Sequence, residues 1–264
     1  MTAYEYLLVD DEPGGVRLIT LNRPDKLNSW NDAMRAEMAH AIEQVARSSE
    51  IKAVIIAGKG RAFSAGEDVS EMESLGASGT RPFRSVLRHL HHVFDTIEEL
   101  EVPVIAAIDG VAAGGGVELA LSCDFRVMGA GSRFVMPEVR VGLIPGSGGC
   151  SRLVKHVGLG RAKELVMLGA AIDAKEAREI GLATRIVPQG SALAGARELA
   201  GELAKLAPLA IGMAKMVLNT CADIDAHTGR RLERLGQSVL KTTEDHIEGA
   251  RAFATKRLPE WKAR

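Results

Sequence analysis

The sequence of 264 residues is long enough to form a full hydrophobic core, and its 46% hydrophobic and 25% charged residues are typical of a globular protein. The formal net charge is -1, from 33 basic and 34 acidic residues, and this balance argues against a nucleic-acid partner. No segment reaches the roughly 18 consecutive apolar residues that span a bilayer, so we expect no membrane partner.

The N-terminus and the cysteines indicate the compartment. The first residues, MTAYEYLLVDDE, contain neither a basic segment nor an apolar run, so we expect a cytoplasmic protein and not a secreted one. Cys123, Cys150 and Cys221 are far apart and form no CxxC pair. They are best interpreted as buried thiols in a reducing environment, not as disulfides or zinc ligands.

The first sixty residues predict an α/β fold. Residues 4–9 and 15–21 alternate as strands do around a turn at Asp11–Gly14, which predicts a hairpin. Apolar residues at helical spacing then predict an amphipathic helix over residues 31–48, and residues 52–57 predict a buried strand. A strand, a helix and a strand in this order are typical of a crossover unit.

The next segment, residues 58–68, predicts a loop that passes close to a ligand. Its sequence, GKGRAFSAGED, superficially resembles a phosphate-binding loop, but no Gly-Lys-Ser/Thr ends it. The small residues Ser64, Ala65 and Gly66 leave room for a ligand against the backbone. A helix over residues 69–75 and a mobile polar rim over residues 76–80 are predicted to follow.

An amphipathic helix is predicted to end before Pro103. Its apolar residues recur at helical spacing, at Phe83, Leu87, Leu90, Phe94 and Ile97. The same helix carries three histidines, His89, His91 and His92. With no acidic or cysteine partner at ligand spacing, they indicate a solvated polar face better than they indicate a metal site.

The stretch from residue 104 to residue 138 has the features of an active site. A buried strand over residues 104–108 is followed by three glycines and then by a helical pattern. A glycine cluster at a helix start leaves backbone N–H groups accessible to a ligand. Glu118 lies three residues after Gly115, on the same face of the first turn, and Glu138 follows in a Pro-Glu loop. We expect these groups to converge on one spot.

The remainder of the chain is predicted to be helical. A glycine-rich loop over residues 140–149 leads into a helix, and no G-x-S-x-G motif frames Ser147 as a nucleophile. From residue 160 onward the pattern predicts helices only, with Asp173 and Glu176 as an acidic capping box. Residues 228–256 read as one long helical stretch, kinked near Gly236 and Gly249. We therefore predict a core over residues 1–190 and a helical oligomerisation region over residues 191–264.

Five segments, in this order, carry a resemblance to a known family: NRPDKLN, GRAFSAGEDVSEM, IAAIDGVAAGGGVELALSCD, FVMPEVRVGLIPGSGG and FATKRLPEW. Together they resemble the crotonase, or enoyl-CoA hydratase/isomerase, superfamily over essentially the whole chain. The resemblance implies a spiral of β-β-α units with a C-terminal helical trimerisation region. It also implies a substrate carried as a coenzyme A thioester, and homotrimers or homohexamers.

The resemblance assigns roles to the central residues. It implies backbone N–H groups of Glu67 and Gly115 as the oxyanion hole, where such donors stabilise a developing enolate. Glu118 and Glu138 fill the two positions that hydratases of the family use as acid and base. Gly146 matches the position whose N–H contacts the reacting water. Isomerases often keep only the later carboxylate, here Glu138.

The same resemblance implies contacts to coenzyme A, and some positions depart from the family pattern. The expected contacts come from the loop and from two lysines, namely Ser64, Ala65, Gly66, Asp68, Val69, Lys26 and Lys256. Asp25 stands where some hydratases have a lysine for the phosphates. Glu67 puts an acidic side chain where the family often has a small or apolar one, so this side chain is expected to narrow the acyl pocket or to join the chemistry.

We therefore predict an enzyme that hydrates 2-trans-enoyl-CoA to 3-hydroxyacyl-CoA, with no metal and no cofactor other than the coenzyme A of the substrate. The alternative enzyme is a double-bond isomerase, or another enolate-forming enzyme, that acts on an acyl-CoA. A non-catalytic RNA- or protein-binding member is the alternative from another class, and the balanced charge and the intact glutamate pair argue against it.

Overall fold

The structure is a computed structural model that describes residues 4–68, 70 and 79–264. Except for residue 70, the predicted helix over residues 69–75 lies outside the described part, and so do residues 76–78 of the predicted rim over residues 76–80. The chain begins with the predicted hairpin, in which β1 (Leu7–Glu12) pairs antiparallel with β2 (Val16–Leu21). After α1 (Asp32–Ala46), β3 (Ala53–Gly58) returns parallel to β2, so the predicted crossover unit is confirmed.

Two sheets form the core of the fold. The larger sheet has six strands in the order β1-β2-β3-β5-β7-β10, where the later strands are β5 (Val104–Ile108), β7 (Phe125–Gly129) and β10 (Arg185–Val187). The smaller sheet has four strands in the order β4-β6-β8-β9, namely β4 (Ala62–Ser64), β6 (Val111–Ala113), β8 (Arg133–Val135) and β9 (Ala171–Asp173).

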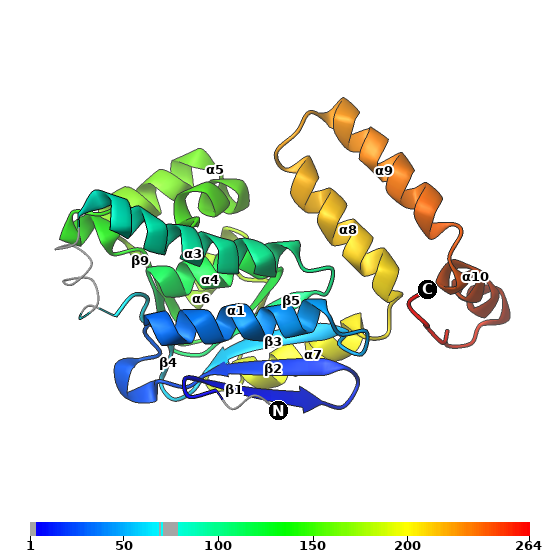
Figure 1. The fold of residues 1–264 in the computed structure, drawn as a ribbon, viewed down its shortest axis with the longest axis horizontal. Coiled ribbons are helices and arrows are strands. Elements are labelled where there is room, and N and C mark those ends of the chain that lie inside the picture. Colours follow the sequence, from blue (N-terminus) through cyan, green and yellow to red (C-terminus); the bar gives the residue numbers. More distant parts are fainter. Residues whose placement is uncertain (1–3, 69, 71–78) are drawn as a thin grey trace.

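The chain passes from one sheet to the other in a repeated way. From β3 it enters β4, from β5 it enters β6, and from β7 it enters β8, and a helix follows each pair. The helices are α3 (Thr80–Glu99), α4 (Gly115–Ser122) and α5 (Gly149–Leu168). This is the predicted spiral of β-β-α units (Figure 1). It brings the starts of α4 and α5 together, because the N–H of Gly149, the first residue of α5, donates to the carboxylate of Glu118 in the first turn of α4.

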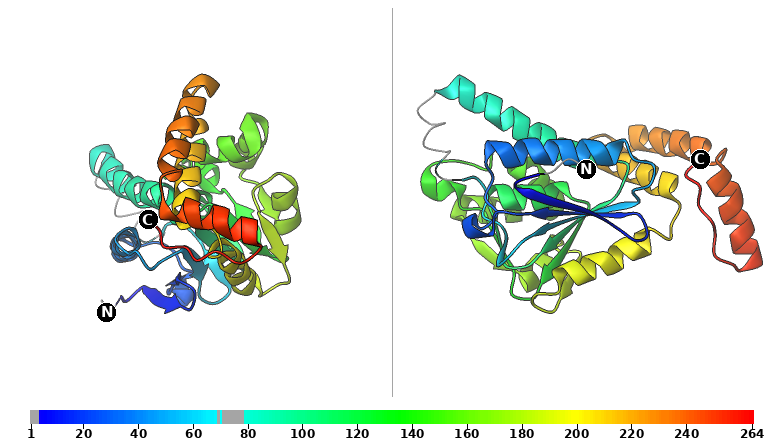
Figure 2. Two further views of the ribbon diagram at one scale, coloured as in Figure 1. Left: turned by 90° about the vertical axis from the view of Figure 1, so that its right-hand side faces the viewer. Right: turned by 60° about the horizontal axis from the view of Figure 1, so that its bottom comes forward.

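The central strands β3 and β5 of the larger sheet are buried on both faces. Alternate residues, such as Val54 and Ile56 of β3, face the main core, whereas Ala53 and Ile55 face the other side. Helix α1 covers the first face, and α7 (Ala192–Leu203) covers the second (Figure 2). Because α7 packs on the sheet, it belongs with the core, although the predicted division at residue 190 placed it in the C-terminal region.

The prediction of helices only after residue 160 is wrong. Strands β9 and β10 lie in that part of the chain, with α6 (Ala174–Glu179) between them. Each of these strands has three residues, which is too short for a period-two pattern to appear in the sequence. The predicted cap of α6 is confirmed, because the Asp173 side chain accepts a hydrogen bond from the Glu176 N–H at 2.8 Å.

Three helices form an extension that leaves the core at one end (Figure 1). They are α8 (Pro208–Cys221), α9 (Ala226–Leu240) and α10 (Glu244–Thr255). The single stretch predicted over residues 228–256 is therefore two helices, and the break falls at Thr243, not at a glycine. The Thr243 side chain accepts a hydrogen bond from the His246 N–H and so starts a new helix.

A buried lysine fixes the extension to the core. Lys215 of α8 pairs with Asp124 at 2.8 Å, and its ammonium also donates to the carbonyls of Ile97 and Val102. These acceptors satisfy a buried cation that would otherwise be costly. None of the helices in the described part of the chain is long and apolar enough to cross a membrane.

Candidate active site

The carboxylates of Glu118 and Glu138, which the sequence analysis expected to converge, line one cavity of about 380 Å³. Glu118 lies in the first turn of α4, and Glu138 begins the short 3₁₀ helix η2 (Glu138–Val141). The glycines at the start of α4 allow the carboxylates to come close to the backbone. A methyl group at position 114 would lie 3.1 Å from Oε1 of Glu138, and one at position 115 would lie 3.9 Å from Oε2 of Glu118.

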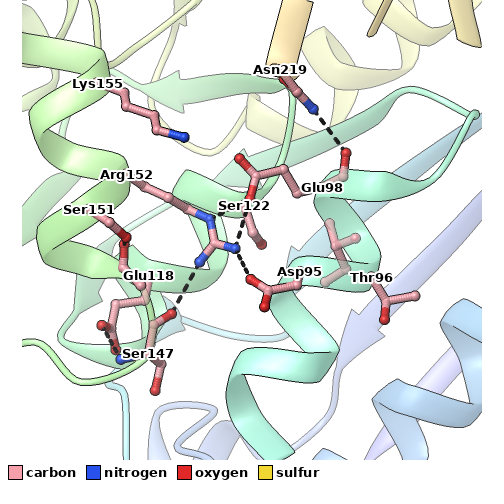
Figure 3. A network of polar contacts seen from close by, with 12 residues as sticks. Asp95, Thr96, Glu98, Glu118, Ser122, Ser147, Ser151, Arg152, Lys155 and Asn219 are labelled. Atoms are coloured by element: carbon pink, nitrogen blue, oxygen red, sulfur yellow. Dashed lines mark hydrogen bonds and ion pairs between the residues drawn. The ribbon is translucent and has the colours of Figure 1, made fainter. Parts of the chain in front are cut away.

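The Glu118 carboxylate is buried and held by backbone donors. Its Oε1 accepts hydrogen bonds from the N–H groups of Ser147 at 2.7 Å and Gly149 at 2.9 Å (Figure 3). Gly149 is the first residue of α5, so the carboxylate also lies at the positive end of that helix. Burial raises the pKa of Glu118, and the two N–H donors oppose this rise by favouring the ionised form.

The Glu138 carboxyl differs from that of Glu118 in its hydrogen bonds. Its Oε2 is buried and has no hydrogen-bond partner among the described residues. Burial, with a further contribution from the nearby Glu118 carboxylate, raises the pKa of Glu138 to about 7. Of the two carboxyls, Glu118 has the donors that stabilise an anion, and Glu138 has the surroundings that retain a proton.

Replacing Glu138 by Gln is expected to raise the melting temperature more at about pH 8.5 than at about pH 5.5. Below the ordinary pKa of 4.5 the carboxyl is neutral whether the chain is folded or unfolded. Between 4.5 and about 7 the unfolded chain ionises while the folded chain keeps the proton, so stability falls as pH rises. Glutamine avoids that loss. Calorimetry at both pH values is the measurement, and equal shifts would contradict the raised pKa.

The backbone around Gly66 lies against the start of α4. Gly66 has φ +86°, and a methyl group there would lie 2.9 Å from the N atom of Gly115. The Trp30 N–H donates to the Gly66 carbonyl at 2.7 Å, and the Asp68 N–H donates to the Trp30 carbonyl at 2.9 Å, which holds the segment in place. The first residue of a helix has no acceptor for its N–H within the helix, and Gly115 occupies that position.

The Glu67 side chain is ion-paired. It lines the cavity, and its carboxylate accepts a hydrogen bond from the Arg35 guanidinium at 2.6 Å. Arg35, on α1, is only 5% exposed and also pairs with Asp32. The pair explains how an acidic residue is accommodated at this position, because the buried cation offsets its charge.

The rest of the cavity wall is apolar and comes largely from α3 and from the loop after η2. The lining side chains are Trp30, Phe83, Leu87, Leu90, Phe94, Leu143, Ile144 and Pro145. The four α3 residues are among those that the helical spacing singled out. Trp30, whose ring packs edge-on against Phe94 at 5.8 Å between centroids, had no signal in the sequence pattern.

Two of the loop residues predicted to contact coenzyme A, Ser64 and Asp68, make hydrogen bonds within the protein. The Ser64 hydroxyl is fully buried and donates to the Asn28 carbonyl at 2.8 Å, so it holds the loop together. The Asp68 carboxylate pairs with Arg23 at 2.9 Å and accepts from the Ser70 hydroxyl and N–H, and these bonds lower the pKa of Asp68 to about 2. Ala65 is half-buried beside Gly66. Val69 lies outside the described residues.

Neither of the two predicted lysines is among the residues that line the cavity. Lys26 is exposed in the short 3₁₀ helix η1 (Pro24–Lys26). Lys256 follows α10, in the extension and at the far end of the molecule from α4 (Figure 1). Within one chain the structure does not bring Lys256 to the carboxylates.

Gly146 lines the cavity, but its recorded hydrogen bond is made by its carbonyl, which lies 2.5 Å from Nε2 of His91. The donors that hold Glu118 are the next residues along, Ser147 and Gly149, which sequence reasoning missed. The glycine-rich loop before a helix was the sequence feature that could have indicated these N–H donors. His91 was interpreted as part of a solvated face, and one ring nitrogen instead meets this loop.

No group of three or more potential metal ligands occurs among the described residues.

An apolar cavity in which the Glu118 and Glu138 carboxyls have contrasting environments, beside a helix N-terminus, is the kind of site that acid–base enzymes use. The sequence matches the family described as Enoyl-CoA hydratase/isomerase over residues 11–264. The chain belongs to this family, which confirms the predicted resemblance.

Similar proteins and structures agree with this assignment. The short-chain-enoyl-CoA hydratase of Clostridium acetobutylicum is 38% identical over 251 residues, covering 95% of each chain. The 2,3-dehydroadipyl-CoA hydratase of Escherichia coli is 36% identical over 253 residues, covering 94% of this chain and 96% of that protein. A crystal structure of enoyl-CoA hydratase from Bacillus anthracis has a TM-score of 0.94 at 34% identity, over 98% of this chain and 100% of that chain.

Proposed function

We propose that the protein hydrates 2-trans-enoyl-CoA thioesters to 3-hydroxyacyl-CoA. The observation that carries this proposal is the pair of carboxylates in one apolar cavity, of which Glu118 has two N–H donors and Glu138 has a pKa raised to about 7. Hydration needs both a base for the water and an acid for the carbon. The hydratases among the similar proteins support the same reaction.

In the proposed reaction, ionised Glu118 takes a proton from a water molecule as its oxygen bonds to the β-carbon. The electron pair of the carbon–carbon double bond moves toward the thioester oxygen, forming an enolate. The N–H groups of Gly115 and Glu67 stabilise this oxygen, and one such donor is typically worth about 3 kcal/mol. Neutral Glu138 then gives its proton to the α-carbon. Transfer of the proton from Glu118 to Glu138 restores the starting state.

The substrate carries its own coenzyme A, and the reaction needs no further cofactor and no metal. The acyl chain is proposed to lie in the apolar part of the cavity, against α3. The thioester is proposed to lie against Ala65, Gly66 and Gly115, where backbone can approach closely. Lys26 and Lys256 remain the proposed partners of the phosphates, with Lys256 supplied by another subunit.

A turnover screen tests the proposed function. The purified protein is given 2-trans-enoyl-CoA substrates of increasing chain length, and 3-enoyl-CoA in parallel, and the products are located by mass spectrometry. The proposal expects 3-hydroxyacyl-CoA from the 2-trans substrates. Formation of 2-enoyl-CoA from 3-enoyl-CoA, without hydration of either, would instead identify an isomerase.

The protein is expected to form a trimer or hexamer in solution. The extension exposes large apolar side chains that a monomer would leave in water, namely Leu235, Val239, Ile247 and Phe253, and the last is 88% exposed. Light scattering at micromolar concentration should give three or six times the chain mass of 28.1 kDa. A species of 28.1 kDa alone would overturn this expectation.

A further inference from the structure

A buried arginine lies directly behind the loop that holds Glu118. Arg152, in the first turn of α5, is 5% exposed, and it is outside the set of residues that line the cavity. Its Nε donates to Glu98 at 2.9 Å and its Nη2 donates to Asp95 at 2.5 Å (Figure 3). Both carboxylates come from α3, so the guanidinium ties the start of α5 to the helix that forms the acyl-pocket wall.

The same residue also holds the loop, through its side chain and its backbone N–H. Its Nη1 donates to the Ser147 carbonyl at 3.2 Å, and the Arg152 N–H donates to the Gly148 carbonyl at 2.9 Å. The loop therefore lies between two groups. Arg152 contacts it on one side. On the other side, the Glu118 carboxylate accepts hydrogen bonds from the N–H groups of Ser147 and Gly149.

The guanidinium packs directly against the backbone of the loop. Gly148 has φ +95°, and a side chain at this position would collide with Nη1 of Arg152. An arginine can hold three acceptors at once because its planar guanidinium has five N–H donors in a fixed arrangement. A lysine has three donors on a flexible stem and cannot reproduce that arrangement.

We propose that Arg152 is a positioning residue for Glu118, which it orients by fixing the Ser147–Gly149 loop against Asp95 and Glu98 of α3. This role rests on the proposed hydration, in which Glu118 is the base. Arg152 does not touch the substrate. Its loss frees the loop, and the two N–H donors no longer hold the carboxylate in one place. A displacement of about 1 Å in a reacting group can cost a hundredfold in rate.

The test compares Arg152→Gln and Arg152→Lys with a matched control, Lys155→Gln. Lys155 lies about one turn further along α5 and pairs with Asp223, and it has no recorded hydrogen bond to the loop. Two quantities are measured: kcat and KM for enoyl-CoA hydration, and the hydrogen exchange of the Ser147 and Gly149 amides. A double variant, Asp95→Asn with Glu98→Gln, keeps the arginine and weakens its anchors.

Arg152→Gln is expected to lower kcat by about ten- to a hundredfold with little change in KM, and to speed exchange of both amides. Arg152→Lys should show smaller changes than Arg152→Gln in both kcat and amide exchange. The double variant should also lower kcat and speed exchange of the two amides. Lys155→Gln should match the unaltered protein. If Arg152→Gln does not fold, the double variant decides. Unchanged hydrogen exchange of the two amides in Arg152→Gln, or a rise in KM with kcat unchanged, would overturn the positioning role.

The exchange measurement separates this inference from the proposed function. If the protein hydrates no enoyl-CoA, the proposed function fails, but faster exchange in Arg152→Gln still supports the role of Arg152 in ordering the loop. If the protein hydrates enoyl-CoA and the loop amides stay protected in Arg152→Gln, the positioning role fails and the proposed function stands.

Discussion

Replacing either Glu118 or Glu138 by glutamine should lower the hydration rate by roughly a hundred- to ten-thousandfold. Glu118→Gln removes the base that two backbone N–H groups hold in place, and the amide cannot take a proton from water. Glu138→Gln removes the group that carries a proton near neutral pH. Steady-state kinetics on a 2-trans-enoyl-CoA measures both. Acyl-CoA binding should change little, because the proposed oxyanion donors belong to the backbone.

The combined variant and a control make this prediction specific. Residues that serve one reaction as a unit give losses that do not add, so Glu118→Gln with Glu138→Gln should be little slower than the worse single variant. Glu99→Gln, an exposed carboxylate at the end of α3, should keep full activity. Near-normal hydration by Glu118→Gln would refute the two-carboxylate mechanism. An isomerase that uses Glu138 alone would instead keep most of its conversion of 3-enoyl-CoA to 2-enoyl-CoA in Glu118→Gln.

The sequence predicted those parts of the fold and the site that rest on local patterns. Alternating residues located the β1–β2 hairpin, helical spacing located α3, and the glycines before Glu118 located the start of α4. Each signal comes from neighbouring residues and the period of their side chains. The two carboxylates were placed together because both flank glycine-rich turns, and the resemblance to a family supplied the pairing.

The parts that were missed depend on long-range contacts. Strands β9 and β10 are recognisable only by the strands they pair with, since three residues show no period. The partners of Glu118 lie 29 and 31 residues away in sequence. Arg152 meets Glu98 and Asp95 only because α5 packs near α3 in the folded chain. Burial likewise sets the pKa of Glu138, and the packing of distant elements determines burial.

Gly66→Ala is expected to lower kcat by about a hundred- to a thousandfold, the usual cost of losing one oxyanion donor. The new methyl group would lie 2.7 Å from the Ala113 carbonyl oxygen and 2.9 Å from the N atom of Gly115, both closer than real contacts allow. Relief of this overlap moves the segment that carries Glu67 away from the start of α4. The two proposed donors then no longer point at one oxygen.

The backbone cost of alanine at a positive φ has to be separated from this effect. Gly14 has the same φ, +86°, but a methyl group there meets no atom within 4 Å. Gly14→Ala therefore bears the cost of about 1 kcal/mol for the left-handed conformation without any displacement of the site. Both variants should lose stability in thermal melts, and only Gly66→Ala should lose turnover per folded molecule. A Gly66→Ala protein that hydrates enoyl-CoA as fast as Gly14→Ala would show that the Glu67 and Gly115 amides do not form the oxyanion hole.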